Sequence, residues 1–243
     1  MEITIKTHWS DISLRDFLKI QEIASKAQEG LAVDAEMLSI LTGEDVRMIK
    51  ALPVSEFNKL AKSVKFIYEE AKPSKIRSEY TINDHRYICK AELAGVSTGQ
   101  YIDYQTYAKM TPRPSLETFI SLWLIPKGHM YNDGYDMEEV KKDILDMPVV
   151  DALGIQVFIV KQLVTLILIT VDSLKSNLKK MGMNPKTIEE ATSPLLSMAS
   201  SLWSSVCASS QSHLSKGFWN GLYSKLSTSL ATLLTNRGSK KNK

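Results

Sequence analysis

The chain has 243 residues, which allows one large domain or two small ones. Hydrophobic residues make up 44% and charged residues 23%, so we expect a packed core and exclude a disordered chain, a collagen-like rod and a disulfide scaffold. The net charge of +3 is too small to indicate a nucleic-acid-binding protein by itself.

The spacing of apolar residues predicts an N-terminal helical region over residues 1–72. The clearest amphipathic helix in it follows Pro53, because apolar side chains recur there at helical spacing from Phe57 to Tyr68. Phe57 begins this stripe. We therefore predict that residues 38–67 act as a packing unit with Phe57 as its anchor.

Residues 73–183 predict a hairpin followed by a helical core. Near-alternating apolar residues flank the turn pair Asn83–Asp84, which indicates a β-hairpin over residues 76–92. A lone hairpin is marginally stable in water, so it must pack on helices or pair with another chain. Helices are predicted again at 97–110 and 115–124.

The loop at residues 126–136 resembles a ligand site more than any other segment does. It fails as a calcium loop, because no Glu follows at the required offset, and as a phosphate loop, because no Ser or Thr follows Lys127–Gly128. His129 lies close to Asp133 in sequence, but no nucleophile accompanies them. We predict a structural turn in which Asp136 caps a helix ending near residue 146.

The two cysteines, Cys89 and Cys207, lie far apart and outside any metal-binding spacing, as do the four histidines. We therefore predict no metal site, no cofactor and no enzymatic activity. Such cysteines are expected to remain thiols in a reducing compartment. The chain opens without a basic and apolar leader, so no signal peptide is expected.

Tyr101, Tyr104 and Tyr107 lie at helical spacing and could stack on nucleobases. Lys109 is the only basic residue nearby, so protein packing is the favoured interpretation, without a specific nucleic-acid partner.

The apolar run Val149–Val171 is long enough to cross a membrane. Lys161 and Gln162 fall near its middle, where a lysine is costly in lipid. A buried core helix is therefore favoured over a membrane span. Because apolar residues occupy nearly every face, we expect this helix to be surrounded on most sides, by its own domain or by a partner chain.

Residues 184–243 form a serine-rich segment with a basic tail, and no charged residue occurs between Glu190 and Lys216. Asn184–Pro185 and Ser193–Pro194 each predict an N-cap and a first helical residue. The segment is either more core or an interaction arm, and composition leaves both open. The predicted partner-binding residues are large and apolar: Trp203, Phe218, Trp219, Leu222 and Leu226.

Four stretches, residues 38–57, 99–107, 124–136 and 147–154, follow one another in a familiar order. Together they resemble tail assembly chaperone-type and other tail-morphogenesis proteins of tailed phages and prophages of Bacteroides-like bacteria. The resemblance covers about residues 35–170, and its most specific unit is Leu41-Thr42-Gly43, a short helix, Leu52-Pro53 and an amphipathic helix.

The resemblance implies a non-enzymatic protein that binds apolar helices of a tape-measure protein or another tail protein in the cytoplasm of the host bacterium. The second interpretation is a structural subunit of the virion neck or tail, and in either case a homo- or hetero-oligomer is expected. A membrane-associated protein that uses Val149–Val171 is a further alternative. The fold we expect is mainly α, a helical bundle with a small inserted β-hairpin and a helical C-terminal extension.

Overall fold

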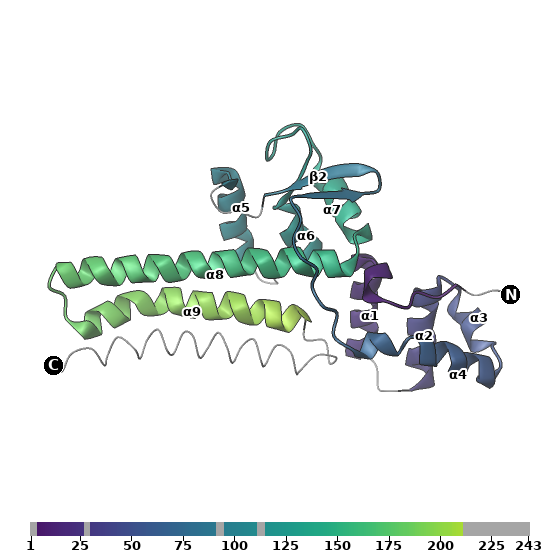
Figure 1. Cartoon of the computed structure of the whole chain (residues 1–243). Coiled ribbons are helices and arrows are strands. Elements are labelled where there is room, and N and C mark those ends of the chain that lie inside the picture. Colours follow the sequence, from purple (N-terminus) through teal and green to yellow (C-terminus); the bar gives the residue numbers. More distant parts are fainter. Residues whose placement is uncertain (1–3, 27–29, 91–94, 111–114, 211–243) are drawn as a thin grey trace.

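The computed structural model describes residues 4–26, 30–90, 95–110 and 115–210. Over these residues the chain is mainly helical, with a small three-stranded antiparallel sheet and two long helices at its end (Figure 1). The predicted fold class, mainly α with an inserted hairpin and a helical C-terminal extension, is confirmed. The predicted division after residues 72 and 183 falls in connections between elements, and it stays a prediction.

Short helices build the N-terminal part: η1 (Trp9–Asp11), α1 (Leu14–Lys26), α2 (Leu31–Thr42), α3 (Val46–Lys50), α4 (Val54–Ser63) and η2 (Lys65–Tyr68). The predicted helix between Phe57 and Tyr68 is divided at Val64, where α4 gives way to η2. Phe57 packs against the core but stays half-exposed, and α4 has no buried residue. The fully buried residues of this unit are instead Leu38, Leu41, Ile49 and Ile67, each at most 2% exposed.

The predicted hairpin is present as β1 (Glu79–Ile82) and β2 (His85–Cys89). Asn83 and Asp84 both adopt positive φ, 49° and 64°, as a two-residue hairpin turn requires. A third strand, β3 (Leu124–Pro126), pairs with β2 and was not predicted. The segment predicted as a helix over 115–124 therefore splits into α6 (Leu116–Ser121) and this strand, while α5 (Thr98–Lys109) matches its prediction.

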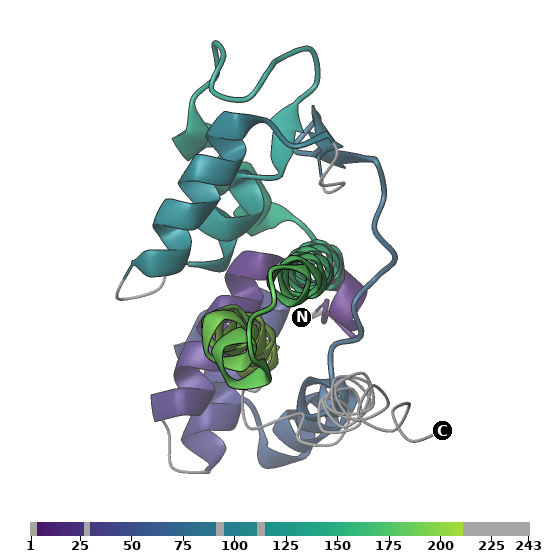
Figure 2. The same cartoon turned by 90° about the vertical axis from the view of Figure 1, so that its left-hand side faces the viewer.

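The long helix α8 (Val149–Lys180) begins directly after Pro148 and follows α7 (Met137–Asp146). Seen end-on in Figure 2, it runs between the N-terminal helices and the layer that holds the sheet and α5 to α7. Its start is fixed by a backbone hydrogen bond of 2.8 Å from Val149 N to Ile12 O. The first turns of α8 are buried in one continuous core that extends from Trp9 to Leu163.

An extended segment, residues 69–78, links η2 to β1 and crosses α8. Ser74 N donates to Val150 O at 2.9 Å, and Ser74 Oγ donates to Asp151 Oδ1 at 2.6 Å. Arg77 forms an ion pair with the same carboxylate. Gly154 permits this crossing, because a Cβ at that position would lie 2.5 Å from Ser74 O.

The last described helix, α9 (Pro185–Ser210), runs back along α8 as its antiparallel partner (Figure 1). Asn184 caps it as predicted, accepting a 2.9 Å hydrogen bond from Thr187 N. The second predicted start, at Ser193–Pro194, is wrong: Pro194 lies inside α9.

Candidate functional site

The hairpin of α8 and α9 forms a second, smaller core away from the body. Val160, Val164, Ile167 and Val171 are spaced three or four residues apart on one face of α8, and each is at most 8% exposed. They pack with Ala199 of α9, which is 2% exposed. Of the serine-rich segment predicted as core or arm, residues 185–210 thus pack as core along α8.

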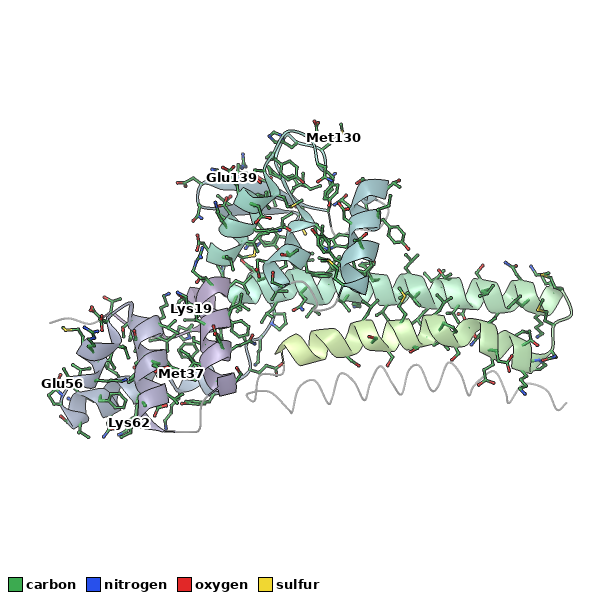
Figure 3. All side chains as sticks on the ribbon, turned by 180° about the vertical axis from the view of Figure 1, so that it is seen from behind. Lys19, Met37, Glu56, Lys62, Met130 and Glu139 are labelled. Atoms are coloured by element: carbon green, nitrogen blue, oxygen red, sulfur yellow. The ribbon has the colours of Figure 1, made fainter. Side chains whose placement is uncertain are left out.

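The C-terminal half of α8 extends beyond the body of the molecule, as Figure 3 shows. Leu166 and Ile169 lie on its surface and are 38% and 61% exposed. At about 100° per residue, Ile169 lies on the face opposite the stripe that packs on α9, and Leu166 lies at the edge of that face. Over its first turns α8 is surrounded on most sides by other described residues, as expected, and cover of the projecting half by a partner chain stays a prediction.

By length and composition alone α8 could cross a membrane, with a mean hydropathy of 2.1 over its most apolar 18-residue window. Within the protein, 56% of that window is buried. Lys161 lies exposed in the middle of the apolar run. This burial is typical of a core helix of a folded protein, which passes the same test.

The predicted partner-binding residues fall largely outside the described part of the chain. The structure describes the backbone of Trp203 as part of α9 but not its side chain. The other four, Phe218, Trp219, Leu222 and Leu226, lie outside the described residues altogether. Their role stays a prediction. The large apolar residues that the structure does place on the hairpin surface are Leu166, Ile169, Met181, Met183 and Met198. The helical spacing of Leu166 and Ile169 was visible within the apolar run.

A polar cluster around Asp143 of α7 holds the β-hairpin against that helix. Asp143 is 9% exposed and accepts hydrogen bonds from Asn83 Nδ2 at 3.1 Å and from the Tyr87 hydroxyl. His85 Nδ1 lies 2.6 Å from Asp143 Oδ2. Sequence analysis missed this cluster, because its members lie about 60 residues apart and form no motif.

The electrostatics of the cluster are those of a structural contact between the β-hairpin and α7. Burial alone would raise the pKa of Asp143, but hydrogen bonds from Tyr87, His85 and Asn83 outweigh it and hold that pKa below its usual value. The hydrogen bond and charge of Asp143 in turn raise the pKa of His85. Burial and the hydrogen bond to Asp143 raise the pKa of Tyr87, so its phenol stays protonated. All three contacts of Asp143 connect the β-hairpin, through its turn and β2, to α7.

The loop at residues 126–136 is a turn, as predicted. Gly128 and Gly134 adopt positive φ of 93° and 72°, and His129 Nδ1 lies 3.0 Å from the backbone oxygen of Asp133. Asp136 caps α7 through a 2.9 Å hydrogen bond from Glu138 N. Met130, labelled at the apex in Figure 3, is 72% exposed.

The tyrosines of α5 divide between packing and surface. Tyr104 is 3% exposed and packs edge-on against Phe119, with ring centroids 6.4 Å apart, and against Trp123. Tyr101 is 43% exposed. The favoured interpretation, protein packing, is confirmed for Tyr104, whose burial leaves no face for a nucleobase.

A groove of about 490 Å³ opens between α2, α4 and η2. Apolar side chains, among them Met37, Leu38 and Val64, line most of it. At its edge the Tyr68 hydroxyl donates to Asp34 Oδ1 at 3.0 Å. The groove is thus a mainly apolar hollow beside the N-terminal core, with Asp34, Lys65, Tyr68 and Glu69 also on its lining.

Among the described residues no group of three or more His, Cys, Asp and Glu side chains could hold a metal ion. The α8–α9 hairpin carries exposed apolar side chains, Leu166 and Ile169 among them, on an extended scaffold. Comparison of the chain with protein-family models, with curated proteins and with solved structures finds no match in any of the three.

Proposed function

We propose that this chain is a non-enzymatic, chaperone-like assembly protein that binds an apolar helix of a phage tail protein, such as a tape-measure protein, along its α8–α9 hairpin. The observation that carries the proposal is the projecting half of α8. It leaves the body of the molecule while keeping Leu166 and Ile169 exposed on one face.

Physical chemistry supports a binding role for this face. Leu166 and Ile169 are three residues apart, so they form a contiguous apolar surface that a second helix can cover. Their helix is held straight and in place by the buried stripe on its other side, so little ordering is required on binding. The phage-tail identity of the partner rests on the sequence resemblance alone.

The proposal is tested by co-expressing the full chain with candidate tail proteins and measuring co-purification and affinity. The double substitution Leu166→Glu and Ile169→Glu should weaken binding more than about tenfold, since central apolar contacts carry most of the energy of an interface. The double substitution Ser176→Glu and Asn177→Glu adds the same charge at other exposed positions of α8 and is the matched control. Unchanged affinity of the double variant would contradict the proposal.

A structural subunit of the virion would bind neighbouring subunits through similar contacts. Mass spectrometry of purified virions separates the two: an assembly chaperone is absent from them, and a structural subunit is present in fixed copy number.

A further inference from the structure

The turn between α8 and α9, residues 181–184, is a tightly fixed reversal. Gly182 adopts a φ of 75°, and Gly182 N and Met183 N donate to Lys179 O and Leu178 O, each at 3.1 Å. These bonds cap the last carbonyls of α8 in the manner of a Schellman motif. Asn184 then caps α9 directly. The backbone of this tip is therefore held in a defined conformation at the end of the hairpin farthest from the body (Figure 1).

The tip combines exposed methionines with lysines. Met181 is 71% exposed and Met183 is 40% exposed. Lys179, Lys180 and Lys186 are exposed around them, and the sequence has no Asp or Glu between Lys175 and Lys186. The tip is thus an apolar point flanked by three lysines, with Glu189 and Glu190 one turn further along α9, and it is convex because it closes a two-helix hairpin.

We propose that this tip docks onto an anionic phospholipid bilayer, with the two methionines entering the interface and the three lysines facing the headgroups. Polybasic clusters beside apolar side chains bind such surfaces additively, about fivefold per lysine. Three lysines thus give about a hundredfold preference for an anionic over a neutral bilayer.

A protein partner fits the tip less well. Energetically dominant interface residues are mostly Trp, Tyr and Arg, and the sequence from Asp172 to Leu202 has none of these. A convex turn also offers no pocket to a partner's side chains. A bilayer needs neither, since it deforms around small apolar groups.

The test is flotation of the full-length protein with vesicles of phosphatidylcholine alone and with vesicles that contain one quarter phosphatidylglycerol. Binding to the anionic vesicles should be about a hundredfold tighter, and it should be lost in 1 M salt, where charges are screened beyond about 3 Å. Replacing Lys179, Lys180 and Lys186 by Gln should abolish the preference, and Met181→Ser with Met183→Ser should weaken binding severalfold.

The matched control replaces three exposed lysines of the N-terminal part, Lys59, Lys62 and Lys65, by Gln. It makes the same change in net charge and should leave vesicle binding intact; circular dichroism checks that every variant is folded. Unchanged flotation of the tip variants would overturn the proposal and assign any binding to another part of the chain, such as the basic C-terminus. If tip variants lose co-purification with a tail protein while the wild type does not float, the tip is a protein contact and the lipid proposal is wrong.

Discussion

At the scale of single residues, Gly154 is the position where the fold tolerates a side chain least. It lies in α8, where glycine is normally about 1 kcal/mol worse than alanine. A Cβ there would lie 2.5 Å from the Ser74 backbone oxygen, so the segment that crosses α8 must shift. We expect Gly154→Ala to lower the free energy of unfolding by about 1–3 kcal/mol in denaturant titrations.

Gly99→Ala is the control for this prediction. Its Cβ would lie 3.4 Å from the Tyr131 ring, an ordinary contact, so stability should stay the same or rise by up to about 1 kcal/mol. Equal stability of the two variants would mean that the segment around Ser74 does not press on α8.

The hydrogen bond between His85 and Asp143 makes stability depend on pH. Because the pKa of His85 is raised in the folded protein, its contribution is fully present below the unfolded value near 6.5 and is lost as the pH rises through the raised folded pKa. Glu139 and Asp84 face His85 and act in the same direction. The melting temperature of the wild type should therefore exceed that of His85→Gln at pH 6, and the difference should shrink toward pH 8.

Asp143, the carboxylate of the same contact, makes stability depend on pH in the acidic range. The pKa of Asp143 is lowered from 3.8, so its contribution is present above that value and is lost as the pH falls through the lowered folded pKa. A melting-temperature difference between wild type and His85→Gln that stays constant from pH 6 to 8 would contradict the assignment of the charge to His85.

At the scale of the elements, Pro194 tests where α9 begins. A proline inside a helix lacks a hydrogen-bond donor and costs up to about 3 kcal/mol, whereas a proline at the first helical position is tolerated. Because Pro194 lies inside α9 and is exposed, Pro194→Ala should raise the free energy of unfolding by up to that amount. Thermal and urea unfolding measure it.

Ser193→Ala distinguishes the two helix boundaries. Inside a helix the substitution is neutral or slightly stabilising, while loss of an N-cap serine costs about 1 kcal/mol. Destabilisation by Ser193→Ala together with no gain from Pro194→Ala would show that a new helix starts at residue 194.

These elements also show what could be predicted from the sequence. Local signals sufficed where one residue type dictates a conformation: Asn83–Asp84 at the hairpin turn, and Asp136 and Asn184 at helix starts. They failed where tertiary contacts decide. Leu124 enters a strand because β2 offers an edge, and Pro194 stays helical because α9 packs along α8.

The candidate site was predicted less well for the same reason. The apolar run of α8 was visible, but which of its faces stays exposed depends on α9, whose register follows from tertiary packing. The Asp143 cluster joins residues from a turn, a strand and a helix. The periodicity of apolar residues predicts single elements, and it does not show which polar side chains of different elements come into contact.

At the scale of the whole molecule, α9 decides whether the projecting half of α8 can stay in water. Val160, Val164, Ile167 and Val171 form a buried stripe whose principal cover is α9. A chain that ends at Met183 lacks this cover and exposes an apolar surface on a helix that extends from the body. Surfaces of this kind lead to association.

We therefore expect the chain of residues 1–183 to bind a hydrophobic dye strongly and to self-associate in analytical ultracentrifugation. A chain that ends at Ser210 retains α9 and is the matched control; it should bind little dye and unfold in one cooperative transition.

The rescuing substitutions Val164→Lys and Ile167→Glu in the 1–183 chain should restore solubility, because they make the uncovered stripe polar. A monomeric 1–183 chain with low dye binding and cooperative unfolding would show instead that residues 185–210 are a dispensable arm. The burial of Ala199 among the valines of α8 argues for the first outcome, since an arm held free for a partner would leave such a small side chain in contact with solvent.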